Sequence, residues 1–172
     1  MPKELEELAR RIRKKSLRRK VLKFLKELDT SPGLPLEESP GGKTRHHAYP
    51  GGLVQHTYAM TKLALFLCDI AEEVYGWKVD RDTVIAACIL HDLMKAATYS
   101  ALEEGYDYSP LGERLDHVSL IIAELRKEKF PMDVVHAVAA HHGDKGPVTP
   151  KTLEALIVHL ADFMDAKLNG MV

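Results

Sequence analysis

An imidazole, a carboxylate and an ammonium interrupt the most apolar stretch of this sequence. The segment VIAACILHDLMKAATY begins at Val84 and reads as a buried helix, yet it contains His91, Asp92 and Lys95. Burying a carboxylate without a partner is costly, and a buried imidazole also needs hydrogen-bond partners. These three side chains therefore require an explanation beyond packing.

Other histidines and aspartates also fall on the apolar sides of predicted helices. Successive members are separated by 21 to 35 residues, about one helix and one loop each, so five helices could aim them at one centre. Neutral imidazoles and carboxylates both bind metal ions, and a metal ion would compensate the buried negative charge. We therefore predict a metal site. Taken singly, each residue also fits a hydrogen-bonded core histidine or a helix-capping aspartate. The predicted ligands are His56, His91, Asp92, His117, His141 and Asp162.

The elements that must position these side chains are predicted to be helices. Apolar periodicity predicts helices over residues 2–28, 53–75, 80–97, 114–129, 131–142 and 149–168. No segment shows convincing strand alternation, so the predicted fold class is all-α, a single compact helical bundle. Residues 98–113 form a long irregular connection, which is typical of an active-site loop.

Composition favours one cytoplasmic domain with a sizeable core. The chain has 172 residues, of which 45% are hydrophobic and 28% charged. No apolar run reaches the roughly 18 residues of a membrane span, and the first residues lack the apolar core of a signal peptide. Cys68 and Cys88 lie in apolar helical contexts, which predicts buried thiols in a reducing compartment.

The first 28 residues are strongly basic. They hold 11 Lys and Arg against four Asp and Glu, and we divide the chain into a basic N-terminal helix, 1–28, and a domain, 29–172. Three interpretations stay open. The helix contacts nucleic-acid phosphates with salt-dependent affinity, pairs with the acidic remainder of the same or a second subunit, or simply docks its apolar stripe on the domain. That stripe consists of Leu5, Leu8, Ile12, Leu17, Val21, Phe24 and Leu28.

The order of the predicted ligands resembles the HD-domain superfamily of metal-dependent phosphohydrolases, named for its His-Asp pair. The segments KTRHHAYPGGLVQHT, HDLMK and AHHGDKGPVTPKTLEALIVHLADFMDAKL are similar to the HD domain of bacterial 3′–5′ exoribonucleases that join an OB-fold to an HD domain. This resemblance covers residues 43–168. Met94 and Asp116 stand where that family often has glycine, and a basic segment stands in place of the OB-fold. RNA binding therefore does not follow from the resemblance.

The resemblance implies two divalent ions, because two extra central histidines are associated with two-metal centres in that superfamily. One ion would be completed by His56, His91 and Asp162, the other by His117 and His141, with Asp92 bridging both. A water molecule activated between the ions would attack phosphorus in line. The imidazole-rich ligand set favours Mn, Fe, Co, Ni or Zn over Mg.

Further candidates surround this set. Lys95 is expected to contact a substrate phosphate or to hold Asp92; the alternative is a surface lysine. His142 could contact substrate, protonate a leaving oxygen or replace His141 as the ligand. The candidate catalytic residues are Asp92, Lys95 and His142. The candidate phosphate-binding residues, most of them in a Gly-rich loop, are Lys43, Arg45, His46, His47 and Lys95.

Several other polar and aromatic residues lie close to the predicted ligands in sequence. Asp165 is a rival ligand three residues after Asp162, and His159 is expected to support a ligand indirectly. His136 is expected to pack in the core. The tyrosines of the long connection would stack on a base or pack the loop down; they are Tyr99, Tyr106 and Tyr108.

The leading hypothesis is a phosphohydrolase that cleaves a phosphoester bond in a nucleotide or short nucleic acid, with a homo-oligomer as a further expectation. One alternative is a phosphatase of another small phosphorylated metabolite. A second is a non-catalytic, metal-stabilised module that binds nucleotides or regulates a partner. A third is oxygen-dependent chemistry at two redox-active irons.

Overall fold

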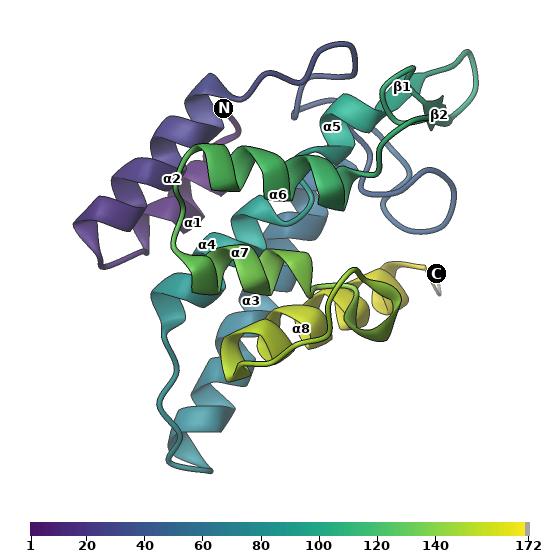
Figure 1. Cartoon of the computed structure of the whole chain (residues 1–172). Helices are drawn as coiled ribbons and strands as arrows, with labels where there is room; N and C mark the ends of the chain where they lie inside the picture. Colours follow the sequence, from purple (N-terminus) through teal and green to yellow (C-terminus); the bar gives the residue numbers. More distant parts are fainter. Residues whose placement is uncertain (171–172) are drawn as a thin grey trace.

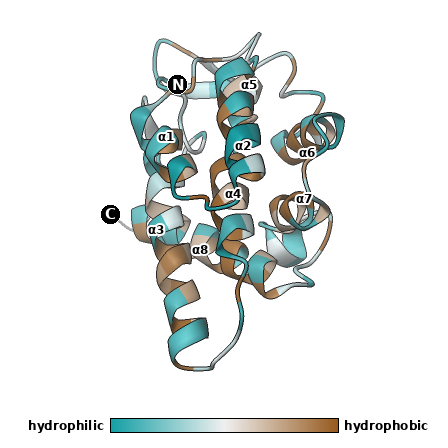
Figure 2. Cartoon of the chain, turned by 90° about the vertical axis from the view of Figure 1, so that its left-hand side faces the viewer, coloured by the Kyte–Doolittle hydropathy of each residue, from teal (hydrophilic) through white to brown (hydrophobic). Residues whose placement is uncertain are grey.

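Helix α4 (Arg81–Leu90) runs through the centre of the molecule, and every residue from Asp82 to Leu90 is buried. The structure is a computed structural model, and it describes residues 1–170. Around α4 pack α3 (Gly52–Glu73), α7 (Met132–Ala139) and α8 (Leu153–Asn169), while α6 (His117–Lys127) covers α7 (Figure 1). Apolar sides turn toward α4, and the outward sides of the N-terminal helices are hydrophilic (Figure 2). The predicted all-α class is confirmed.

The basic N-terminal segment forms two helices, so the prediction of one helix over 2–28 is wrong. Helix α1 (Lys3–Arg10) and α2 (Lys15–Glu27) are separated by a turn. In that turn both oxygens of Asp82 accept hydrogen bonds, from the N–H groups of Arg13 at 2.8 Å and Lys14 at 2.7 Å. A carboxylate is a favourable partner for the free N–H groups at a helix start. The turn lets both helices bury their apolar sides in one shared core.

A small hairpin occupies the long connection that the sequence predicts to be irregular. Strands β1 (Tyr99–Ala101) and β2 (Tyr106–Tyr108) pair antiparallel, with Tyr99 opposite Tyr108. Gly105 has a positive φ of 80° and closes the turn, a conformation that favours glycine. Strands of three residues are too short for alternation to be recognised in a sequence.

The HD pair lies in a turn rather than inside a helix. Helix α4 ends at Leu90, and the short α5 (Lys95–Thr98) starts four residues after His91, so the predicted helix to residue 97 is interrupted. Asp116 begins α6 by accepting the Ser119 N–H at 2.9 Å, which makes His117 the first residue of that helix. The aspartate that departs from the family's glycine is therefore a helix cap.

The prediction of two buried thiols is confirmed. Cys68 and Cys88 are buried and free. Among residues 1–170, no helix is long and apolar enough to cross a membrane.

Candidate metal centre

Four side chains from three regions of the bundle form the first group, which we call the inner cluster. It contains His56 from α3, His91 and Asp92 from the turn after α4, and Asp162 from α8, with ligand atoms within 4.8 Å of one another. The Nε2 atom of His56 lies 3.3 Å from Nε2 of His91 and 3.1 Å from Oδ1 of Asp162. The Nε2 atom of His91 lies 3.2 Å from Oδ2 of Asp92. These atoms surround a common point.

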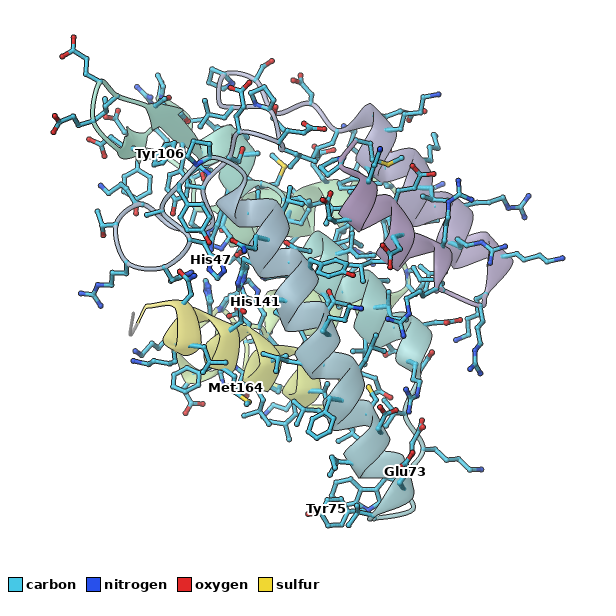
Figure 3. All side chains as sticks on the ribbon, turned by 180° about the vertical axis from the view of Figure 1, so that it is seen from behind. His47, Glu73, Tyr75, Tyr106, His141 and Met164 are labelled. Carbon is cyan, nitrogen blue, oxygen red and sulfur yellow. The ribbon has the colours of Figure 1, made fainter. Side chains whose placement is uncertain are left out.

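Three histidines on the other side of Asp92 form the outer cluster. They are His117, at the start of α6, and His141 and His142, which follow the end of α7. The Oδ1 atom of Asp92 lies 3.1 Å from Nε2 of His117 and 3.6 Å from Nε2 of His141. Asp92 therefore presents one oxygen to each cluster. Figure 3 shows His141 and His47 close together between α3 and α8.

Backbone carbonyls fix the tautomers of two of these rings. The Nδ1 atom of His91 lies 2.8 Å from the carbonyl oxygen of Cys88, and Nδ1 of His141 lies 2.6 Å from that of Val138. A carbonyl oxygen only accepts, so each Nδ1 carries the proton and donates it. In the neutral rings the Nε2 lone pairs consequently point toward Asp92, as metal ligation requires.

Asp165 stands behind the inner cluster. Its Oδ2 atom accepts a hydrogen bond of 2.6 Å from Nδ1 of His56, and it lies 3.5 Å from Nε2 of His47. Asp165 therefore orients His56 from the side away from the other cluster members, which is the arrangement of a carboxylate that supports a ligand histidine. From the sequence, Asp165 is a rival ligand because it lies on the same helix face as Asp162.

Several buried polar atoms of the site lack hydrogen-bond partners within residues 1–170. They are Oδ1 of Asp92 and the Nε2 atoms of His117 and His141, while Oδ2 of Asp92 pairs with the Lys95 ammonium at 2.5 Å. Buried polar atoms in folded proteins are nearly always hydrogen-bonded. Lone pairs left free on carboxylate and imidazole groups are the donor set of a transition-metal site, so the residues present fit divalent cations.

The electrostatics of the site also favour a cation. Burial opposes ionisation of Asp92, but the charges of His91 and Lys95 outweigh it and hold the pKa of this carboxyl well below its usual value. Burial would lower the pKa of His91, yet the negative charges of Asp92 and Asp162 raise it to about 10. Two ionised carboxylates in a buried site attract positive charge strongly.

Lys95 is buried against the site. Its ammonium lies 2.5 Å from Oδ2 of Asp92 and donates a 2.8 Å hydrogen bond to the carbonyl oxygen of Gly41. Lys95 thus holds Asp92 in place, one of the two roles that the sequence suggests, and anchors the loop before α3. Its contact with a phosphate stays a prediction.

The four loop residues that the sequence predicts to bind phosphate have different surroundings in the structure. Lys43 pairs with Asp107 of β2 at 2.8 Å, and Arg45 is exposed. Burial lowers the pKa of His47 to about 4 despite the nearby charge of Asp165. Only His46 lines the pocket described next.

A pocket of about 310 Å³ opens beside both clusters. Its walls come from the loop before α3 (His46), the segment after α7 (His142, Lys145) and α8 (Asp162, Phe163). The contributions of Lys145 and Phe163 are missed by the sequence interpretation. A larger cavity of about 660 Å³, between the start of α1 and residues 49–58, contains no member of either cluster.

His159 supports the outer cluster indirectly. Its Nδ1 atom donates to the carbonyl oxygen of His141 at 2.7 Å. Gly143 permits this close packing, because its φ is +59° and a Cβ there would lie 2.5 Å from the His159 ring. His136 is only half-buried, and its Nε2 accepts the Lys151 N–H at 3.0 Å.

The tyrosines of the long connection lie on the hairpin. The rings of Tyr99 and Tyr108 have centroids 5.7 Å apart, and together with His117 they line a separate cavity of about 330 Å³. Tyr99 is buried, whereas Tyr108 is 48% exposed. For Tyr99, packing of the loop therefore explains the presence of a tyrosine.

Comparisons with known proteins agree with this geometry. The HD domain family model matches residues 53–167, more than half of the chain. The dihydroneopterin 2′,3′-cyclic phosphate phosphodiesterase of Methanocaldococcus jannaschii is 44% identical over 176 residues, which cover 97% of this chain and 70% of that protein. The 3′-5′ exoribonuclease YhaM of Bacillus subtilis is 33% identical over 143 residues, or 77% of this chain and 44% of that protein. The chain thus spans less than half of this exoribonuclease. No solved structure matches significantly.

Proposed function

We propose that this chain, which belongs to the HD domain family, is a metal-dependent phosphohydrolase that opens a cyclic phosphodiester of a small nucleotide-like molecule. The position of Asp92 is the observation that carries the proposal, because its two buried oxygens face the two clusters and Oδ1 has no hydrogen-bond partner within residues 1–170. The relative from M. jannaschii acts, by its name, on a cyclic phosphate, and it matches nearly the whole chain.

Each cluster would hold one divalent ion, Mn, Fe, Co, Ni or Zn. We assign the inner ion to the inner cluster with Oδ2 of Asp92, and the outer ion to His117 and His141 with Oδ1 of Asp92. Such ions lower the pKa of a bound water molecule and neutralise charge on the reacting phosphoryl group. The chain itself keeps the Nε2 lone pairs directed inward, and Lys95 holds Asp92 in the bridging position.

The pocket supports a small substrate. About 310 Å³ is at the lower end of the range for small-molecule sites, which suits a single nucleotide-sized ligand. His46, Lys95 and Lys145 line it and would offer donors or positive charge to an anionic phosphate. Burial lowers the pKa of His142, so this ring is neutral at pH 7 and can donate a hydrogen bond to a phosphate oxygen.

Removal of nucleotides from RNA is the second candidate activity. The resemblance to YhaM and the exposed basic residues of α1 and α2 favour it. Because α1 and α2 share the core, their deletion would unfold the chain, and surface charges are the better test. Arg11→Glu with Arg19→Glu should weaken RNA binding and flatten its salt dependence. Unchanged affinity and salt slope would exclude this surface from RNA binding.

Self-association stays a prediction. An exposed apolar stripe on α8 would supply the contact surface, and sedimentation of the purified chain tests it. The stripe consists of Leu156, Leu160, Met164 and Leu168.

The test of the activity is a substrate panel with added Mn. The panel contains nucleoside 2′,3′-cyclic phosphates, nucleoside monophosphates, dinucleotides and short RNA. We expect turnover of the cyclic phosphates and its loss in Asp92→Ala, with normal activity in Glu73→Ala, an exposed acid at the far end of α3 (Figure 3). Activity that survives Asp92→Ala would refute the proposal.

A further inference from the structure

We propose that Phe163 is the platform on which the planar ring of the substrate stacks, and that this residue selects ring-bearing cyclic phosphodiesters over ringless ones. The inference rests on the proposed function, because it concerns the pocket beside the two clusters. It adds to that function a residue that determines specificity for the ring of the substrate.

One face of α8 forms a wall of the pocket. His159, Asp162, Phe163 and Ala166 all line it, at the i, i+3, i+4 and i+7 spacing of a single helix face. Asp162 reaches the inner cluster, with its Oδ1 atom 3.1 Å from Nε2 of His56. Phe163 is the next residue along the chain, so a ligand whose phosphate lies at the clusters can place a neighbouring ring on Phe163.

Phe163 is exposed although it lines a pocket beside buried polar groups. Its exposed fraction is 53%, so packing in the core does not explain a phenylalanine at this position. The Lys167 ammonium lies 5.6 Å from the Phe163 ring centroid, and the His159 ring is 6.5 Å away. A ring so placed can stack with a planar ligand, since an aromatic side chain can stack on the face of any nucleobase.

The outer apolar stripe of α8 is distinct from this wall. Met164 and Leu160 are similarly exposed, at 41% and 39%, but neither lines the pocket. Phe66 on α3 is also exposed, at 61%, and is likewise outside the pocket. Phe163 therefore differs from these exposed apolar residues because it lines the pocket. Phe66 is a matched control, since it is also an exposed phenylalanine on a helix.

The rest of the pocket suits an anion that carries one ring. Lys145 is exposed and forms no ion pair with any group in residues 1–170, so its charge is available to the ligand. The Nδ1 atom of His46, which also lines the pocket, is buried without a hydrogen-bond partner in the same part of the chain. These groups lie on the loop before α3 and the segment after α7, whereas Phe163 supplies the apolar wall from α8.

The experiment compares two cyclic phosphates in the Mn-loaded chain of residues 1–172. Adenosine 2′,3′-cyclic phosphate carries a ring, and glycerol 1,2-cyclic phosphate does not. In Phe163→Ala we expect KM for the adenosine ester to rise about ten-fold with kcat nearly unchanged, while both constants for the glycerol ester stay unchanged. Phe163→Trp should restore KM, and Phe66→Ala should behave as wild type.

Equal effects on the two esters, or no effect on either, would overturn the inference. If the unmodified protein turns over neither ester, the proposed function fails, and titration calorimetry with adenosine 3′-monophosphate then tests the platform by itself. Weaker binding in Phe163→Ala but not in Phe66→Ala would support it, and equal or absent binding would refute it. A changed sedimentation coefficient with unchanged KM would assign Phe163 to contact with a second copy instead.

Discussion

The inner and outer clusters share Asp92 but differ in how the rest of their ligands are held. In the inner cluster His56 and Asp162 project from the interiors of the long helices α3 and α8, and His91 is fully buried. In the outer cluster His117 begins α6, and His141 follows the end of α7. Helix interiors are held by hydrogen bonds on both sides, whereas helix ends fray more readily.

The two clusters also differ in charge. The inner cluster has two carboxylates, while the outer cluster has only the shared Oδ1 of Asp92 and three imidazoles. More negative charge in a more rigid frame gives a tighter cation site. We therefore expect the inner ion to bind first, and the outer ion to exchange more readily.

Among the substitutions that affect one cluster alone, Asp162→Ala should have the largest effect. It removes a carboxylate from the inner cluster, so we expect loss of the tight ion and a fall in kcat/KM of about a thousand-fold, because metal ions contribute several kcal/mol to the stabilisation of phosphoryl charge. The metal content of the protein after gel filtration measures the loss of the ion, and steady-state kinetics measures the fall in kcat/KM. Retention of the tight ion would show that Asp162 is not a ligand.

His117→Ala should separate the clusters. It removes one outer ligand, so the variant should keep one ion per chain and lose the second, with a drop of about a hundred-fold in kcat/KM. His136→Ala is the control, since His136 belongs to neither cluster and, within the described residues, its ring bonds only to the Lys151 N–H. Loss of both ions in His117→Ala would contradict the independence of the inner cluster.

Asp165→Asn tests the support behind the inner cluster. Loss of the charged acceptor for His56 Nδ1 should weaken binding of the tight ion about 10–100-fold, as is typical of such supporting carboxylates. Binding of the second ion should not change. Asp144→Asn, an exposed acid beside the outer cluster, provides the control for titration calorimetry. An equal loss at both sites would indicate a general structural role.

Gly143→Ala should have the smallest effect, confined to the support of the outer cluster. The added Cβ would lie 2.5 Å from the His159 ring at a φ of +59°. We expect a loss of about 1–2 kcal/mol in the free energy of unfolding, measured in urea, and weaker binding of the second ion only. Unchanged stability would mean that the turn adapts freely.

The sequence predicts most residues of the candidate metal centre because inward polar residues stand out against apolar helix faces. It predicts neither which partner a buried carboxylate meets nor which apolar residues line a pocket. Asp165 shares a helix face with Asp162, yet it contacts the back of His56, and Phe163 reads as one more apolar residue of α8. Periodicity specifies a face of a helix, while such roles depend on the neighbouring helix.

The break in the N-terminal segment has a signal in the spacing of its apolar residues. The apolar stripe passes from Ile12 to Leu17, a step of five residues. Five residues turn a helix by about 500°, which places Leu17 roughly 140° away from Ile12. One helix could not bury both side chains on the same face, and the turn capped by Asp82 resolves the conflict.

Calorimetric titration of the metal-free protein with Mn, beside the same titration of Asp92→Ala, tests the central claim most directly. If the two clusters share Asp92, the unmodified protein should bind two ions per chain, the second at least about ten-fold more weakly than the first. The Asp92→Ala variant should show a severe loss of binding of both ions. Identical titrations of the two proteins, or no binding by either, would contradict the account.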